Sequence, residues 1–378
     1  MSHIGLDIGF TGAKAVVFSL EGRILSKSYS DYGSGYKSNL LLKNEIDPYH
    51  IISAVKKVLR QCKSTSVKDK PKTIAVSVSG DDLFPADNEG RSVYNVLSAY
   101  NRKPVKYRKL ILDRLSGPDN IFYQTGQVLE TDVLGLPRIL WLNDNIDDLF
   151  KKTWKFLCWE SYINWYMTGF AVTDFSNASR FLTFDIIHKR WAKNILDAFG
   201  IPENTMPDAV QAGSFIGKIR AGVAEELNLP PDLNVVAGGF DQATAALGAG
   251  IIEPGIFSLG MGTVFASHWI IDEFTKAIIK EMPNNYTKSK YRNKPANALT
   301  DSGVSLNTMQ NRAKPYPYCG YLMKDMYMGL LCNFNGSNAI NWFFDNLAAY
   351  EKSRYKNDVY EYFNKQISSS PSNLFFMP

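Results

Sequence analysis

Residues 3–29 read HIGLDIGFTGAKAVVFSLEGRILSKSY, and they carry the clearest indication of the fold. Apolar residues alternate with small or polar residues in three short runs, as is typical of β-strands. Glycines separate the runs, with Gly9 and Gly12 in the first turn and Gly22 in the second. The pattern predicts two consecutive hairpins, with strands over residues 3–8, 13–19 and 24–29.

A helix and a fourth strand are expected after the hairpins. Asp47 and Pro48 are typical of a helix start, and apolar residues recur at helical spacing from Ile51 to Leu59. Residues 73–78 then predict a buried strand. The order strand, strand, strand, helix, strand resembles the opening of the ribonuclease-H-like unit found in a superfamily of ATP-binding proteins.

The rest of the chain predicts a mostly helical middle and then a second hairpin. This hairpin would open a second, related domain, and we place the two domains at residues 1–250 and 251–378. The polar, turn-rich residues 276–324 predict a surface excursion, and residues 374–378 a strand-like run. Helices are expected over 137–145, 147–166, 191–199, 221–227, 242–250, 338–352 and 358–367, and strands over 234–238, 257–260 and 264–271.

The composition argues against several classes of protein. The chain has 378 residues, 45% of them apolar, which suits two globular domains. The net charge of +5 is not gathered in one segment, so neither nucleic acid nor membrane is expected as a partner. The four cysteines lack metal-ligand spacing, and neither a targeting peptide nor an apolar run of about 20 residues occurs. We therefore expect a cytoplasmic protein.

The first motif with chemical potential occupies residues 5–14. Transfer of a phosphoryl group to an alcohol needs a cradle for phosphates, a metal ion and a proton-accepting carboxylate. Asp7 ends a predicted strand and would hold Mg²⁺. Gly9, Thr11 and Lys14 belong to a tight turn whose N–H groups can approach phosphate oxygens. An ordinary hairpin with a solvated Asp is the alternative interpretation of this motif alone.

The second motif occupies residues 238–250 and carries the candidate catalytic base. Asp241 lies between a strand end and a helix rich in Ala and Gly, where the helix dipole favours the ionised, proton-accepting carboxylate. Gln242 can hydrogen-bond a polyol. The alternative is an N-capping Asp, which explains Asp241 but not the two preceding glycines.

The third motif is a second glycine turn over residues 258–263. Gly262 and Thr263 would bind phosphate from the second domain, opposite the first turn. The alternative is a plain hairpin turn. The order and spacing of the three motifs together favour phosphoryl transfer.

With these motifs the chain resembles the FGGY family of carbohydrate kinases, which includes glycerol, xylulose and gluconate kinases. Residues 7–14 match the first phosphate motif, although Phe10 stands where a hydroxyl residue is usual. Asp241 stands at the general base, and Gly262 with Thr263 at the second phosphate turn. Segments that we interpret as structural also follow the family pattern, at residues 136–141, 167–169, 173–174, 178–179 and 184–185.

The resemblance implies an α/β fold with two ribonuclease-H-like domains, as in actin, hexokinase and Hsp70, facing a nucleotide cleft. The second domain would be incomplete here, because residues 374–378 match a strand in its middle and family chains continue with the loop that holds adenosine. The resemblance also implies ATP and Mg²⁺ as cofactors, a sugar as substrate, and a homodimer.

The expected sugar site departs from the glycerol kinases. Residues 77–87 align with the segment that carries an Arg-Glu pair for glycerol, but Gly80 and Asp81 stand there instead. Asp81, Asp82 and Gln242 are expected to bind the hydroxyls of a larger sugar, and Arg102 aligns with an Arg of the family. The alternative for the two acids is a polar turn at a strand end.

We thus expect an ATP-dependent sugar kinase with Asp241 as general base. A catalytically impaired, sugar-binding pseudo-kinase without the adenosine site is the alternative, motivated by Phe10 and the missing loop. A carboxylate acceptor is a third interpretation, which the acidic pair Asp81 and Asp82 disfavours through like-charge repulsion.

Overall fold

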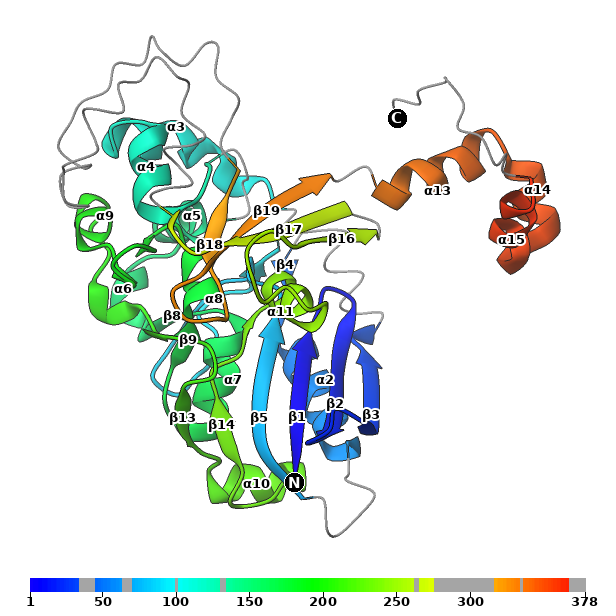
Figure 1. Ribbon diagram of the computed structural model, residues 1–378. Helices are drawn as coiled ribbons and strands as arrows, with labels where there is room; N and C mark the ends of the chain where they lie inside the picture. The colour runs from blue at the N-terminus through cyan, green and yellow to red at the C-terminus, as the bar shows by residue number, and fades with distance from the viewer. Residues whose placement is uncertain are drawn as a thin grey trace.

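The computed structural model describes residues 1–33, 45–62, 70–98, 101–129, 134–261, 265–274, 316–333 and 336–366. A mixed β-sheet forms the centre of the molecule, with helices packed on it and a smaller sheet above it (Figure 1). Within these residues the central sheet has seven strands in the order β13-β14-β5-β1-β2-β3, with β15 beside β5. The predicted α/β fold is confirmed.

The opening elements form as the sequence predicts. The strands β1 (Ser2–Ile8), β2 (Gly12–Ser19) and β3 (Ile24–Asp31) pair antiparallel, and β5 (Pro71–Val78) pairs parallel with β1. Helix α2 (Pro48–Gln61) connects the hairpins to β5. The side chain of Asp47 caps this helix by accepting a hydrogen bond of 2.9 Å from the backbone N–H of Tyr49.

The two faces of the central sheet have different roles. Apolar side chains of β1 and β5, such as Leu6 and Val76, pack on one face against α2, α7 (Trp159–Thr168) and α10 (Ala221–Leu227). The alternate residues Asp7 and Ser77 lie on the opposite face. Helix α11 (Asp241–Gly248) is anchored there by a hydrogen bond of 2.8 Å between the hydroxyls of Ser77 and Thr244.

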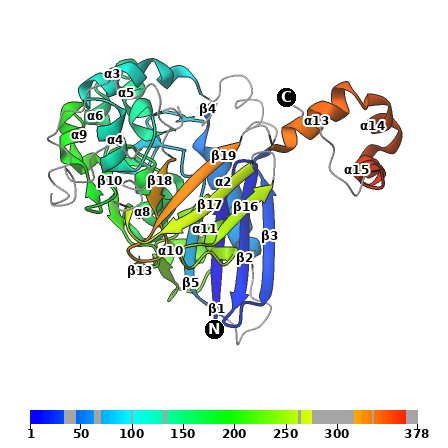
Figure 2. The same cartoon turned by 45° about the horizontal axis from the view of Figure 1, so that its top comes forward.

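The smaller sheet contains the second predicted hairpin. It consists of β16 (Phe257–Met261), β17 (Phe265–Ile271), β19 (Tyr327–Asn333) and β18 (Tyr318–Gly320), in that order. These strands cross above α11 in the view of Figure 2. Apolar residues of α11 and of this sheet, including Ala246, Ile270 and Met328, share one core.

Strand β18 ties the smaller sheet to the first part of the chain. The backbone N–H of Tyr318 donates to the carbonyl of Gly126 at 2.7 Å, and the Gln127 amide donates to the carbonyl of Tyr318 at 2.5 Å. The N–H of Gly320 donates to the Ser179 hydroxyl at 3.1 Å. All three residues of β18 are buried. The expectation that residues 276–324 form a surface excursion is therefore wrong for β18, while residues 275–315 lie outside the described residues.

Two of the predicted helices are interrupted in the structure. Residues 147–166 form α6 (Leu149–Lys152), β8 (Lys155–Leu157) and then α7, because β8 pairs antiparallel with β6 (Phe84–Ala86). A pairing partner 70 residues away is invisible to helical periodicity. The expected helix 338–352 is likewise interrupted, and forms α13 (Gly336–Asn346) and α14 (Ala349–Tyr355). The strand-like run 374–378 lies outside the described residues.

The remaining elements complete the chain. Helices α13, α14 and α15 project away from the sheets in Figures 1 and 2, around a small core of Phe344, Ala348 and Val359. None of the described helices is long and apolar enough to cross a membrane. The other bounds are β4 Glu45–Ile46, β7 Val96–Leu97, η1 Lys103–Tyr107, α3 Arg108–Arg114, α4 Pro118–Thr125, α5 Gly135–Asn145, β9 Val172–Asp174, α8 Phe175–Ser179, β10 Phe184–Asp185, β11 Arg190–Trp191, α9 Lys193–Ala198, η2 Glu203–Thr205, β12 Asp208–Val210, β13 Phe215–Lys218, β14 Asn234–Val236, β15 Gly239–Phe240, η5 Lys356–Asp358 and α15 Val359–Asn364.

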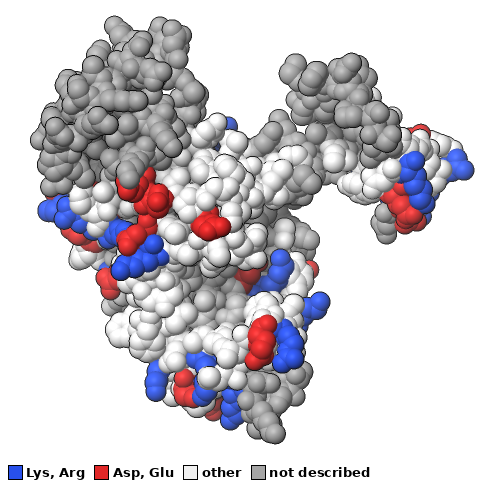
Figure 3. All heavy atoms as spheres, in the orientation of Figure 1, with Lys and Arg blue, Asp and Glu red and all other residues white. Residues whose placement is uncertain are grey.

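Surface ion pairs join neighbouring segments. Lys72 pairs with Asp232 at 2.7 Å and Arg60 with Glu226 at 3.2 Å. On the face drawn in Figure 3, basic and acidic side chains likewise lie next to one another in small groups. Exposed pairs of this kind contribute little to stability, so the buried contacts described above hold the elements together.

Candidate active site

Asp241 is the first residue of α11 and follows directly on β15. The N-cap position belongs to Phe240, so Asp241 is not the capping residue that its place in the sequence also allowed. β15 pairs with β5, and Gly238 immediately before it is needed there. A Cβ atom at position 238 would lie 1.9 Å from the carbonyl oxygen of Val76, so the two strands meet only because this residue has no side chain.

The surroundings of Asp241 suit a proton acceptor. Its Oδ1 atom is buried and accepts no hydrogen bond from the described residues. Burial raises the pKa of Asp241 to about 7, and the carboxylates of Asp81 and Asp7 add to this effect, while Arg180 opposes it. A carboxylate with an unused lone pair and a pKa near neutrality is well matched to general base catalysis.

The first glycine turn lies at the end of β1. Asp7 is the cross-strand neighbour of Lys14, whose Nζ lies 3.7 Å from the Asp7 carboxylate. The turn closes through a hydrogen bond of 3.2 Å from the N–H of Gly9 to the carbonyl of Gly12. Thr11 and Lys14 are exposed. The predicted phosphate-binding groups therefore lie together on an open edge, on the face of the sheet that carries α11.

The second glycine turn lies outside the described residues, and Gly262 and Thr263 with it. The strands β16 and β17, which lead into and out of this turn, are paired up to Met261 and Phe265. The role of the turn as a second phosphate site stays a prediction.

Asp81 is held by a buried arginine. The Nε and Nη2 atoms of Arg180 donate to Asp81 Oδ1 at 2.8 and 2.6 Å, and its Nη1 donates to Gln127 Oε1 at 2.9 Å. A Cβ atom at Gly80 would lie 2.7 Å from the ring of Phe240 and 3.0 Å from Arg180, so no side chain fits there. The guanidinium beside Asp81 thus comes from Arg180, the residue directly after α8, since position 80 cannot supply one.

Asp82 has a different environment from Asp81. It is buried and accepts a hydrogen bond of 2.9 Å from the indole N–H of Trp159. Burial raises the pKa of Asp82 to about 6, against the effect of the neighbouring Arg138. Arg102 is exposed and precedes η1. Asp81 is therefore the more accessible of the two acids, and contacts of Asp82 and Arg102 with a sugar stay predictions.

Gln242 is connected to the smaller sheet. Its Oε1 lies 2.8 Å from Nε2 of His268 on β17, whose Nδ1 lies 3.0 Å from the hydroxyl of Ser258 on β16. Burial lowers the pKa of His268, so the neutral ring donates from Nε2 and accepts at Nδ1. The Gln242 side-chain oxygen is thus engaged by His268, and contact of its amide N–H groups with a sugar stays a prediction.

Known proteins resemble this chain in sequence and in fold. Residues 2–248 match the N-terminal domain of the FGGY family of carbohydrate kinases. The chain belongs to this family. A xylulose kinase of Lactococcus lactis is 28% identical over 275 residues, which are 70% of this chain and 53% of that protein. An L-fuculokinase of Escherichia coli is 27% identical over 255 residues, which are 65% of this chain and 52% of that protein.

Solved structures support the same fold. The crystal structure of a xylulose kinase from Rhodospirillum rubrum has a TM-score of 0.76 at 18% identity, and covers 98% of this FGGY chain and 68% of that one. The chain spans about half the length of the curated relatives it matches. Its fold is therefore that of the FGGY kinases.

Sequence reasoning missed two polar residues of this FGGY site. Arg180 directly follows Ala178 and Ser179, which matched the family pattern and were interpreted as structural. Gln127 lies in an unremarkable segment between α4 and α5. The only sign of Arg180 in the sequence was a charged residue next to two small residues, Ala178 and Ser179, which are buried in the structure. The direction of its guanidinium becomes clear only from the packing of Arg180 against the ring of Phe240.

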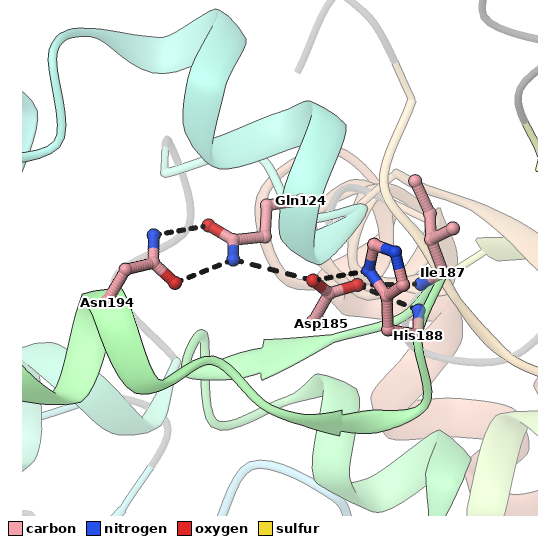
Figure 4. Close-up of polar contacts among 5 residues, drawn as sticks. All are labelled: Gln124, Asp185, Ile187, His188 and Asn194. Atoms are coloured by element: carbon pink, nitrogen blue, oxygen red, sulfur yellow. Dashed lines mark hydrogen bonds and ion pairs between the residues drawn. The ribbon is translucent and has the colours of Figure 1, made fainter. Parts of the chain in front are cut away.

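Asp185 of the FGGY chain has the structural role that the sequence predicts. Its Oδ1 accepts from the N–H groups of Ile187 and His188 at 3.1 and 2.9 Å, and its Oδ2 lies 2.9 Å from the His188 ring (Figure 4). Gln124 and Asn194 form a reciprocal amide pair beside it. This carboxylate fixes a turn, and its oxygens are occupied by the chain itself.

Proposed function

We propose that this chain transfers the terminal phosphoryl group of ATP to a hydroxyl of a sugar or a sugar-derived polyol, with Asp241 as general base. The observation that carries the proposal is the buried Oδ1 of Asp241, which has no hydrogen-bond donor among the described residues and belongs to a carboxyl with a pKa of about 7. Such a group accepts a proton readily once a hydroxyl is placed against it.

The neighbours of Asp241 supply the binding of the sugar. Asp81, fixed by Arg180, accepts hydrogen bonds from hydroxyl groups, and Gln242 donates to hydroxyl oxygens from the adjacent position. The oxygen of the sugar hydroxyl forms a bond to the terminal phosphorus of ATP, while Asp241 accepts the proton of that hydroxyl. The bond between this phosphorus and the ADP oxygen breaks, and ADP leaves. Asp241 then returns the proton to solvent.

Asp7, Thr11 and Lys14 are the proposed phosphate side of the site. The accessible carboxylate of Asp7 fits a Mg²⁺ ion that keeps most of its water and is held mainly by phosphate oxygens. The described residues contain no group of three or more His, Cys, Asp or Glu side chains placed to cage a metal, which agrees with this shared mode of binding. When bound, the ion neutralises charge on the phosphates.

The substrate class follows from the relatives and from the charges of the site. The curated relatives include xylulose kinases and an L-fuculokinase, so we propose a neutral monosaccharide as the acceptor. Asp81 and Asp241 together would repel an anionic acceptor. In the proposed arrangement residues 1–250 bind the sugar and residues 251–378 contribute to nucleotide binding.

A sugar-binding protein without catalysis is the second candidate function. The exposed Phe10 favours it, because it occupies the first phosphate turn at a position where the resembling kinases carry a hydroxyl.

The first test is ADP release measured by a coupled assay with a panel of ketoses, aldoses and polyols. We expect ADP release that depends on one class of sugar and is lost in Asp241→Asn, while sugar binding measured by calorimetry persists. Sugar binding without ADP release in the unaltered chain would instead identify the non-catalytic protein. Full turnover in Asp241→Asn would disprove the role of the base.

A further inference from the structure

A buried polar network lies beside the backbone that leads to Asp241. The Oε1 of Glu160 on α7 accepts a hydrogen bond of 2.8 Å from the N–H of Gly238. The hydroxyl of Ser176 on α8 accepts one of 2.9 Å from the N–H of Phe240. The backbone N–H groups of two of the three residues before Asp241 are thus bonded to side chains of α7 and α8.

The network is closed by a second carboxylate. Asp174 accepts a hydrogen bond of 2.6 Å from the Ser176 hydroxyl, and its own N–H donates to Glu160 Oε2 at 2.8 Å. Asn177 donates to both carboxylates, at 2.9 Å to Glu160 and at 3.0 Å to Asp174. Glu160, Asp174, Ser176 and Asn177 have no exposed surface. Among the side-chain polar atoms of these four residues only Asn177 Oδ1 lacks a hydrogen-bond partner in the described part of the chain, and a buried network so nearly satisfied is rigid.

The strand geometry explains why side chains, and not a neighbouring strand, accept the hydrogen bonds of these two N–H groups. Successive N–H groups of a strand point to opposite sides, and β15 pairs with β5 on one side only. The N–H groups of Gly238 and Phe240 are satisfied on the other side, by Glu160 and Ser176. Burying two carboxylates is costly, since burial and their mutual repulsion raise the pKa of Glu160 and burial raises that of Asp174. A network kept at that cost, next to the proposed base, fits a role in setting its position.

We propose that Glu160, Asp174 and Ser176 are positioning residues, which hold the junction of β15 and α11 and thereby fix Asp241 against the sugar hydroxyl. This inference rests on the proposed function for its catalytic meaning, and on the hydrogen bonds alone for its structural meaning. None of the three residues contacts the sugar. Their effect should therefore appear in kcat rather than in substrate affinity.

The test compares Ser176→Ala with Ser161→Ala in the 378-residue chain. Ser161 is a matched control, because it is a buried serine whose hydroxyl bonds to Cys158 at the start of α7 and not to β15. We expect kcat to fall about tenfold in Ser176→Ala, with both KM values within twofold of the unaltered chain. Ser161→Ala should keep kcat within twofold at a similar loss in Tm. Equal kcat values in the two variants would overturn the inference.

A second readout separates this inference from the proposed function. Hydrogen exchange of the Phe240 N–H, followed by NMR, should be at least tenfold faster in Ser176→Ala than in Ser161→Ala. Glu160→Gln should do the same at Gly238, because the three donors on Oε2 orient the amide so that its NH₂ group faces the Gly238 N–H. If the unaltered chain releases no ADP with any sugar, the proposed function fails. Hydrogen exchange of the Phe240 and Gly238 N–H groups then tests the positioning role by itself. Unchanged protection of both amides would then overturn the positioning role.

Discussion

Replacing the proposed base should make the protein more stable and less active. Asp241→Asn removes a carboxyl whose pKa rises from 3.8 in the unfolded chain to about 7 in the folded one. Below pH 4 the group is protonated in both states and costs nothing. Between pH 4 and 7 the unfolded chain ionises and the folded chain does not, so the folded state loses stability as the pH rises.

The size of the effect follows from the shift of about 3 pKa units. At about 1.4 kcal/mol per unit, the unaltered chain carries a penalty of up to about 4 kcal/mol above pH 7. The buried Asn amide has its own desolvation cost of about 1–3 kcal/mol, and this cost does not depend on pH. We therefore expect the free energy of unfolding of Asp241→Asn, relative to the unaltered chain, to increase by about 2–4 kcal/mol between pH 4 and pH 8.

Urea unfolding of both proteins at pH 4 and pH 8 measures this difference, and kcat measured on the same samples should fall about 10²- to 10⁴-fold at pH 8. If the proposed activity holds, the unaltered chain should lose kcat as the pH falls through about 7, because protonated Asp241 cannot accept a proton. A stability difference that is the same at both pH values would contradict this prediction, since Asp241 would then titrate alike in the folded and unfolded chains.

Three further changes test other parts of the site. Gly238→Ala should lower the free energy of unfolding by more than about 2 kcal/mol, because its Cβ would overlap the Val76 carbonyl. Gly222→Ala in α10 is the control, because nothing lies within 4 Å of its Cβ, and it should raise the free energy of unfolding by about 0.5–1 kcal/mol. Urea unfolding measures both differences. Arg180→Met should raise the KM for sugar about tenfold or more, because Asp81 loses its anchor, and an unchanged KM in initial-rate kinetics would contradict that arrangement. His268→Ala should raise the same KM a few-fold by releasing Gln242, while Leu331→Ala, at an exposed position of the neighbouring strand β19, should leave it unaltered.

The sequence predicts the elements whose signals are local. The alternation of residues 3–29 and the Asp47-Pro48 helix start depend on neighbours in the chain, and these elements form as predicted. Strand β8 is different, because its three residues adopt extended geometry only by pairing with β6. A short amphipathic segment in that position carries helical periodicity, and tertiary pairing overrides it.

The same distinction applies to the site. The places of Asp241 and Asp7 in the fold were predictable, because each stands beside glycines that a tight turn or a close approach requires, while their chemical roles stay predictions. Arg180 and Glu160 were not, because their roles depend on which backbone and which carboxylate they meet across the fold. The sequence also does not distinguish the two acids predicted to bind sugar. In the fold they have different partners, because Asp81 accepts a hydrogen bond from Arg180 and Asp82 accepts one from Trp159.

The hydrogen bonds between β18 and the first part of the chain have a consequence for folding during synthesis on the ribosome. Gln127 anchors Arg180, and its own amide is bonded to the carbonyl of Tyr318, 191 residues later in the sequence. On the ribosome, residues 1–250 emerge first, so the central sheet can form while this bond still lacks its partner. The arginine that orients Asp81 would gain its final support only after Tyr318 has left the exit tunnel. Contacts of such long sequence separation slow folding, and nascent chains in which Tyr318 is still inside the exit tunnel should hold Arg180 less firmly than chains in which it has emerged.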